Sequence, residues 1–235
     1  MFFLRSIRTV AAMLALAQGF LAPPPRQGEA SGSLAAVTFT LNFPQSNPED
    51  YSISIDSTGH AHYTCTGYVA PGSEPDTYRF EFEVSPETRE KIFALAKQAR
   101  YFGGNVDSGN RKLAFTGTKI LTYHDAQRDH TARYEYSNLA PVRELTDVFQ
   151  GMAATLEYGR RLAYYHQYQK LALDDELKRM EAQARNNELS EVHCVAPVLQ
   201  KIVDDASVLN ITRARAQELM EMGNAGSVVA GHNVR

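Results

Sequence analysis

One uninterrupted stretch, residues 142–169, limits the possible folds more than any other part of this sequence. It follows Pro141, contains no further proline, and its apolar and small residues recur at the spacing of an α-helix. At about 100° per residue, one narrow arc contains Leu145, Val148, Phe149, Met152, Leu156, Gly159 and Ala163. A helix of roughly 40 Å therefore has an apolar face along its whole length.

The second half of this helix carries another face. The residues opposite the arc there are Tyr158, Arg161, Tyr165 and Tyr168, whereas the back of the first half carries Arg143, Asp147 and Gln150. We expect the first face to cover a β-sheet built by the preceding residues. We expect the second face to pack against the helices that follow.

The preceding residues alternate between apolar and polar, as half-buried strands do. Strands are predicted at Val37–Phe43, Tyr51–Cys65 (two strands), Tyr78–Val84, Thr118–His124 and His130–Tyr136, and a first helix begins at Ser85-Pro86-Glu87. Further helices are predicted from Asp174, over Ser190–Asp205, and over Arg213–Met222 with Thr212 as its cap. The sequence thus predicts an α+β protein: an antiparallel sheet of about six strands covered by two helices, with a C-terminal helical extension.

The clearest local feature is a hairpin around Asp56-Ser57-Thr58-Gly59, which suits a turn with glycine in the left-handed position. This turn places Asp56 opposite His60, Ile55 opposite Ala61 and Ile53 opposite Tyr63. The predicted buried face is Ile53, Ile55, Ala61, Tyr63 and Cys65, with Ser52, Ser54, Asp56, His60, His62 and Thr64 outside.

The chain divides into five predicted parts. They are a signal peptide (1–22), a flexible leader (23–36), the α+β domain (37–169), a helical extension packed on the 141–169 helix (170–222) and a disordered tail (223–235). The first part has Arg5 and Arg8 before the apolar run Val10–Ala22, which is typical of export to the periplasm or exterior. An N-terminal helix of a cytosolic protein is the alternative. The apolar run is too short for a transmembrane span, and none is expected in the mature chain.

Two segments carry a resemblance to known proteins. The pattern Ile55-Asp56-x-x-Gly59-x-x-x-Tyr63 resembles the opening hairpin of certain exported bacterial domains of unknown function. The run from Phe149 to Leu162 is similar to uncharacterised exported bacterial proteins of about this length. The resemblance implies export, but no activity and no functional residues.

Charge and motifs narrow the function classes. The formal net charge is −3 with mixed signs, and no basic block occurs, so nucleic acid is not an expected partner. No serine lies in Gly-x-Ser-x-Gly or Ser-x-x-Lys, no Cys-x-x-Cys or His-Glu-x-x-His occurs, and no phosphate-binding Gly-Lys-Ser/Thr is present. No catalytic residue and no cofactor are predicted. The two cysteines, Cys65 and Cys194, could form one disulfide or remain free thiols.

Two groups of residues are candidate sites. Asp56, His60 and His62 share one face of the hairpin, and alternate histidines on a strand can share a metal; ordinary surface residues are the alternative, which we favour. Tyr158, Arg161, Tyr165 and Tyr168 could form a binding surface, because Tyr and Arg are enriched at interfaces. Internal packing of the C-terminal helices is the interpretation we favour for them. His166 and His193 are interpreted as helix-packing residues.

Three functions remain compatible with the sequence. The leading hypothesis is an exported, non-catalytic module that binds a protein or an envelope component. The alternatives are an extracytoplasmic hydrolase or metal-dependent enzyme, and a purely structural envelope protein.

Overall fold

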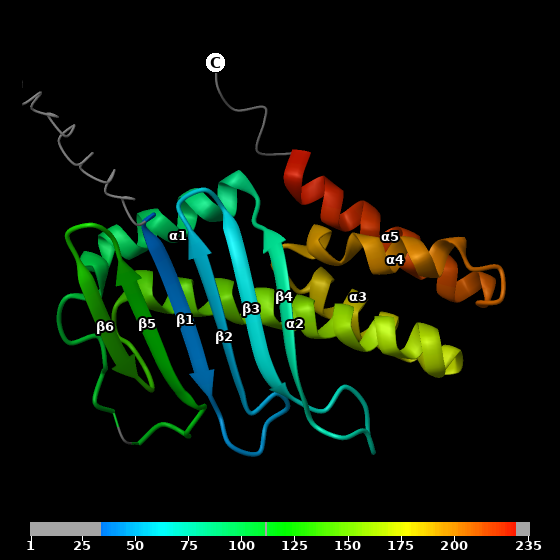
Figure 1. The fold of residues 1–235 in the computed structure, drawn as a ribbon, viewed down its shortest axis with the longest axis horizontal. Helices are drawn as coiled ribbons and strands as arrows, with labels where there is room; N and C mark the ends of the chain where they lie inside the picture. The colour runs from blue at the N-terminus through cyan, green and yellow to red at the C-terminus, as the bar shows by residue number, and fades with distance from the viewer. Residues whose placement is uncertain (1–33, 111, 229–235) are drawn as a thin grey trace, which may run out of the picture. The chain divides into compact units, whose positions relative to one another are not determined.

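The computed structural model describes residues 34–110 and 112–228, and within them six strands form one antiparallel sheet (Figure 1). The strand order is β4-β3-β2-β1-β5-β6, so β1 lies inside the sheet between β2 and β5. The strands are β1 (Ala36–Asn42), β2 (Asp50–Asp56), β3 (His60–Gly67), β4 (Asp76–Glu83), β5 (Thr118–His124) and β6 (Asp129–Tyr134). The predicted α+β class with a six-stranded antiparallel sheet is confirmed.

The predicted register of the β2–β3 hairpin is also confirmed. Ile55 pairs with Ala61 and Ile53 with Tyr63. The turn depends on Gly59, whose φ of +103° is unfavourable for any residue with a Cβ. Asp56 Oδ1 accepts hydrogen bonds from the backbone N–H groups of the turn, including that of Gly59. The turn chemistry and the apolar alternation therefore specify the same register.

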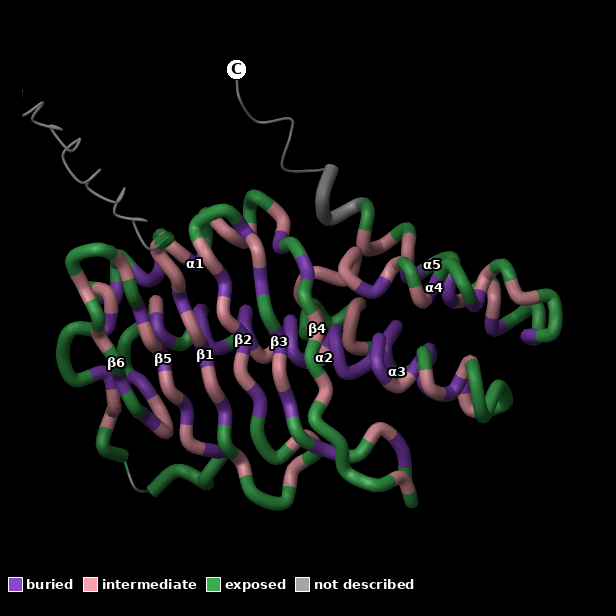
Figure 2. Tube along the Cα trace, in the orientation of Figure 1, coloured by how far each residue is buried: buried purple, intermediate pink, exposed green. Residues whose placement is uncertain are grey.

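Two helices cover one face of this sheet, α1 (Pro86–Gln98) and α2 (Ala140–Tyr168), and both lie behind it in Figure 1. Alternate residues along β1, β2 and β3 are buried against them (Figure 2). Ser85 caps α1 by accepting a hydrogen bond from the N–H of Thr88, as expected from the sequence. At the centre of the core, the rings of Phe39 and Phe149 are stacked with centroids 5.3 Å apart.

A second core forms around the later half of α2. The elements that build it are α3 (Leu173–Arg185), α4 (Ala196–Asp204) and α5 (Asn210–Val228). Two short 3₁₀ helices, η2 (Lys170–Ala172) and η3 (Val192–Val195), precede α3 and α4. A third 3₁₀ helix, η1 (Arg100–Phe102), follows α1. Its fully buried side chains include Leu162, Leu173, Leu177 and Leu199. Gly159 allows η3 to approach α2, because an added Cβ would lie 2.5 Å from Val195 Cγ1.

Several sequence expectations are corrected here. Ala163 is exposed, and its neighbour Leu162 is buried instead, because the second core with residues of α3, α4 and α5 forms on that side of α2. The helix predicted over Ser190–Asp205 is divided into η3 and α4, with Pro197 in the first turn of α4, where no backbone N–H is needed. Thr212 is not a cap; it is buried within α5, which begins at Asn210.

The predicted tail is wrong for residues 223–228, which continue α5. A single glycine costs a helix only about 1 kcal/mol, so Gly223 does not end it. The predicted signal peptide, most of the leader and residues 229–235 lie outside the described residues. Within the described part, no helix is both long enough and apolar enough to cross a bilayer. Both cysteines are free thiols, Cys65 buried and Cys194 half-buried.

Candidate functional site

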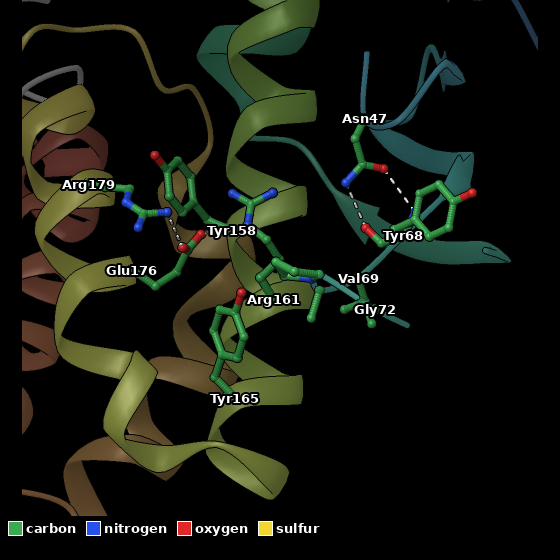
Figure 3. A pocket seen from close by; sticks show the side chains of 11 residues that line it. Asn47, Tyr68, Val69, Gly72, Tyr158, Arg161, Tyr165, Glu176 and Arg179 are labelled. Atoms are coloured by element: carbon green, nitrogen blue, oxygen red, sulfur yellow. Dashed lines mark hydrogen bonds and ion pairs between the residues drawn. The ribbon is translucent and has the colours of Figure 1, made fainter. Parts of the chain in front are cut away.

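A hollow lies between the later half of α2, α3 and the loop joining β3 to β4 (Figure 3). Its volume is about 480 Å³. The residues that line it are Asn47, Tyr68, Val69, Ala70, Pro71, Gly72, Tyr158, Arg161, Tyr165, Glu176 and Arg179. We call it the α2–α3 groove. Three of the four binding residues predicted from the sequence line it, whereas Tyr168 is 63% exposed and lies outside it.

The α2 wall of the groove follows from helical spacing. Tyr158, Arg161 and Tyr165 are three and four residues apart, so they share one face of the helix. The guanidinium carbon of Arg161 lies 4.7 Å from the ring centroid of Tyr158. Tyr158 and Tyr165 are buried in the second core, so most of each ring packs internally, as favoured from the sequence, while both also line the groove.

The α3 wall carries a charged triplet, which helical spacing alone does not connect to α2. Arg161 Nε lies 2.6 Å from Glu176 Oε1, and Arg179 Nη1 lies 3.4 Å from Glu176 Oε2. Glu176 is buried, and each of its carboxylate oxygens pairs with one guanidinium group. The triplet therefore has one carboxylate for two guanidinium groups. The Arg179 side chain is 69% exposed. The groove therefore presents excess positive charge at its α3 rim.

The loop wall is held by a reciprocal pair of hydrogen bonds. Asn47 Nδ2 donates to the carbonyl of Tyr68 (2.8 Å), and the Tyr68 N–H donates to Asn47 Oδ1 (2.9 Å). These bonds join the β1–β2 loop to the β3–β4 loop (Figure 3). They leave the Tyr68 ring half exposed at the rim. No sequence spacing brings Asn47 and Tyr68 together, so they were missed.

A second hollow of about 310 Å³ shares Asn47, Tyr158 and Arg161 with the groove. It continues along α2 past Gln150, towards Phe43 at the end of β1. Its lining is largely apolar and amide, with Gln183 on the α3 side. The second hollow therefore extends the α2–α3 groove further along α2.

Beneath the second hollow lies a buried polar network between β3 and α2, which was also missed. Glu157 Oε1 accepts hydrogen bonds from the Tyr63 hydroxyl (2.8 Å) and the Cys65 thiol (3.2 Å). Arg160 donates to Cys65 Sγ (3.4 Å) and to the carbonyl of Gly67 (3.0 Å), and it forms an ion pair with Asp76. Glu157 Oε2 has no hydrogen-bond partner among the described residues and lies 3.6 Å from Arg160 Nη1.

This network does not activate its thiol. Burial, and next the Glu157 carboxylate, raise the pKa of Cys65 to about 12. Burial is also the main cause of the raised pKa of the Tyr63 phenol. A nucleophilic cysteine needs a lowered pKa, so the network has the character of a structural anchor for α2. It fixes the helix, and with it the groove wall, on the sheet.

The predicted metal residues are only partly brought together. His60 and His62 lie side by side on β3, with ring centroids 4.7 Å apart. Asp56 is not part of their cluster, because its Oδ1 is occupied by the turn. The third potential ligand is Glu81 on β4, whose position beside the histidines the sequence pattern does not reveal. The three potential ligand atoms lie within 4.8 Å of one another.

The remaining histidines of the described residues have local partners. His124 lies 3.8 Å from Asp129 across the β5–β6 turn, and His130 contacts the carbonyl of Tyr101. His166 Nε2 lies 2.9 Å from Asp205 Oδ2, which links α2 to the α4–α5 loop.

A second potential ligand cluster is Glu191, His193 and Cys194. The Glu191 carboxylate accepts hydrogen bonds from the N–H and hydroxyl of Ser85 and from the hydroxyl of Thr88, so it is held at the N-terminus of α1. These hydrogen bonds explain why Glu191 lies beside His193 and Cys194.

No protein-family model matches this sequence, and no curated protein matches it.

Proposed function

We propose that this chain is an exported, non-catalytic module that binds a protein or an envelope component in the α2–α3 groove. The observation that carries the proposal is the groove itself, whose walls combine tyrosine rings with an excess of guanidinium groups. Tyr and Arg supply much of the binding energy at protein interfaces. The buried Glu157–Arg160 network supports a pre-formed wall, because it fixes α2 directly below the groove.

The groove chemistry favours a particular kind of segment. Arg179 is exposed at the α3 rim and can pair with a carboxylate, while Tyr68 offers an exposed ring on the opposite, loop side of the groove (Figure 3). The apolar walls accept an aliphatic or aromatic side chain. The ligand is therefore a segment that presents an acidic group beside an apolar one.

Affinity capture from the native envelope tests the proposal when wild type and groove variants are compared. The variants are Arg179→Gln and Tyr68→Ala, whose side chains are exposed, and Glu176 keeps its ion pair with Arg161, so folding should be retained. Lys97→Gln, exposed on α1, is the matched charge-removal control. A component that co-purifies with wild type and the control, and is lost with both groove variants, supports the function. Equal recovery with all four proteins contradicts it.

Export is part of the same proposal and has its own test. The basic start and apolar run of residues 1–22, together with the hairpin resemblance, support it. Mass spectrometry of the protein from its source cells should find a new N-terminus between Ala15 and Ala22. An intact N-terminus on cytosolic protein contradicts export while leaving the groove hypothesis testable.

A further inference from the structure

The outward face of β3 and β4 carries a cluster of imidazole and carboxylate groups in strict register. His60 is directly opposite Glu83, and His62 is directly opposite Glu81. Residues two apart on a strand point to the same face, so all four side chains project from the side of the sheet opposite α1 and α2. The register places two imidazoles beside two carboxylates.

The hydrogen bond of His60 prepares one of its ring nitrogens for a ligand. His60 Nδ1 lies 2.8 Å from Glu83 Oε1. A carboxylate at Nδ1 accepts the N–H there and leaves the lone pair on Nε2. Histidines that bind metals almost always have such a carboxylate or carbonyl partner on the other nitrogen. Glu83 thus supplies the orienting contact that could not be identified from the sequence.

We propose that His60, His62 and Glu81 bind a divalent transition-metal ion of the zinc class. Their potential ligand atoms lie within 4.8 Å of one another, which small side-chain rotations can reduce to a shared coordination sphere. Two imidazoles and one carboxylate are a ligand set that Zn²⁺ accepts, with water completing the tetrahedron. The site is on an open face, so it binds the ion reversibly and leaves a coordination position for a donor from outside.

The site is independent of the proposed groove function. The imidazole cluster belongs to the uncovered face of β3 and β4, whereas α2 and α3 form the groove on the helical side. The side chains of His60 and His62 are 38% and 55% exposed, so ions reach them without any opening of the fold.

Isothermal titration of the untagged full chain with ZnCl₂ tests the proposal. We expect one ion per chain for wild type. His60→Ala and His62→Ala should each weaken binding by at least about tenfold, and Glu81→Gln should weaken it as a lost ligand. Glu83→Gln should weaken it by roughly 10- to 100-fold, the usual effect of losing an orienting partner. Replacing Zn²⁺ by Co²⁺ gives a visible absorption band that reports tetrahedral coordination directly.

His124→Ala is the matched control, because His124 is an exposed histidine at the end of another strand, near a carboxylate. It should bind as wild type does. Thermal melting without metal confirms that each variant is folded. Wild-type affinity in both His60→Ala and His62→Ala overturns the site. An equal loss in His124→Ala also overturns it, since binding would then be general to surface histidines.

Discussion

Phe149 connects α2 to the centre of the sheet through its stacking on Phe39. The side chain is fully buried, so its removal leaves a cavity that the surrounding strands cannot close. Phe149→Ala should lower the free energy of unfolding by about 3–5 kcal/mol. Asp147→Ala, two residues away on the exposed side of the helix, should change it by less than about 0.5 kcal/mol. Urea denaturation of both variants checks this, and similar losses would contradict the assigned orientation of α2.

The positive charge of Arg160 offsets the free-energy cost of burying the Glu157 carboxylate. Its guanidinium lies 3.6 Å from the Glu157 oxygen that has no hydrogen bond within the described structure. Arg160→Met leaves that carboxylate buried without its cation and should cost about 3–5 kcal/mol.

The double variant Glu157→Gln/Arg160→Met should recover part of this loss, because no buried charge remains. Chemical denaturation of the single and double variants gives the coupling free energy. Arg79→Met, exposed on β4, is the control. A double variant that loses the full sum of the single effects would show that the two charges act separately.

At the scale of elements, the later half of α2 depends on the helices that follow it. Tyr165 and Leu162 are buried there by contacts with residues of α3 and α4. Tyr165→Ala should therefore destabilise the protein by about 3 kcal/mol. A chain ending at Gln169 should expose this face and bind a hydrophobic dye. A soluble, dye-free truncation with wild-type stability would mean that the tyrosine face does not need α3–α5.

The β2–β3 hairpin was predictable because both of its strands alternate in phase with its turn. The same alternation could not place β4 against β3, since residues 68–75 form a loop whose length does not specify a register. Glu81 and Glu83 were therefore not connected to the histidines. The first face of α2 was predictable from its apolar spacing, except at Ala163, where small size does not reveal direction.

The buried charged residues of the helices could not be predicted from the sequence. Glu157, Arg160 and Glu181 are buried, although a charge on a helix usually indicates a solvent-facing position. Besides any partner on its own helix, each has a partner far away in sequence, such as Tyr63 for Glu157 and Arg215 for Glu181. Such pairs arise from tertiary packing and leave no local pattern.

For the molecule as a whole, buried thiols and phenols control the response to alkali. Burial raises the pKa of Cys65 from 9.0 to about 12 and that of Tyr134 from 10.0 to about 12, and it also raises the pKa of Tyr63. Above about pH 9, the unfolded chain releases protons that the folded chain keeps. The free energy of unfolding must then fall as pH rises, by up to about 1.4 kcal/mol per pH unit for each group.

Lys119 acts in the opposite direction, because burial lowers its pKa and the folded chain loses that proton first. One lysine cannot offset three acids, so the net effect is alkaline destabilisation. Urea denaturation at about pH 8 and about pH 10.5 measures it, and Cys65→Ala should reduce the slope. A stability that stays constant across this range would contradict the proposed burial of these groups.

The position of β1 also has a consequence for how the chain comes together during synthesis. β1 is made before every other described strand, yet one of its two neighbours, β5, follows only after α1 has been completed. Meanwhile β1–β4 can pair as a meander. The edge of β1 that pairs with β5 stays unpaired, and the apolar face of β1 stays exposed until α2 has been made. Pairings between distant segments form slowly, and exposed apolar strands associate with other chains. β1, which pairs on both edges in the folded protein, is thus incompletely paired for the longest time during synthesis. A chaperone at the ribosome or translocon would therefore have its largest effect before β5 emerges.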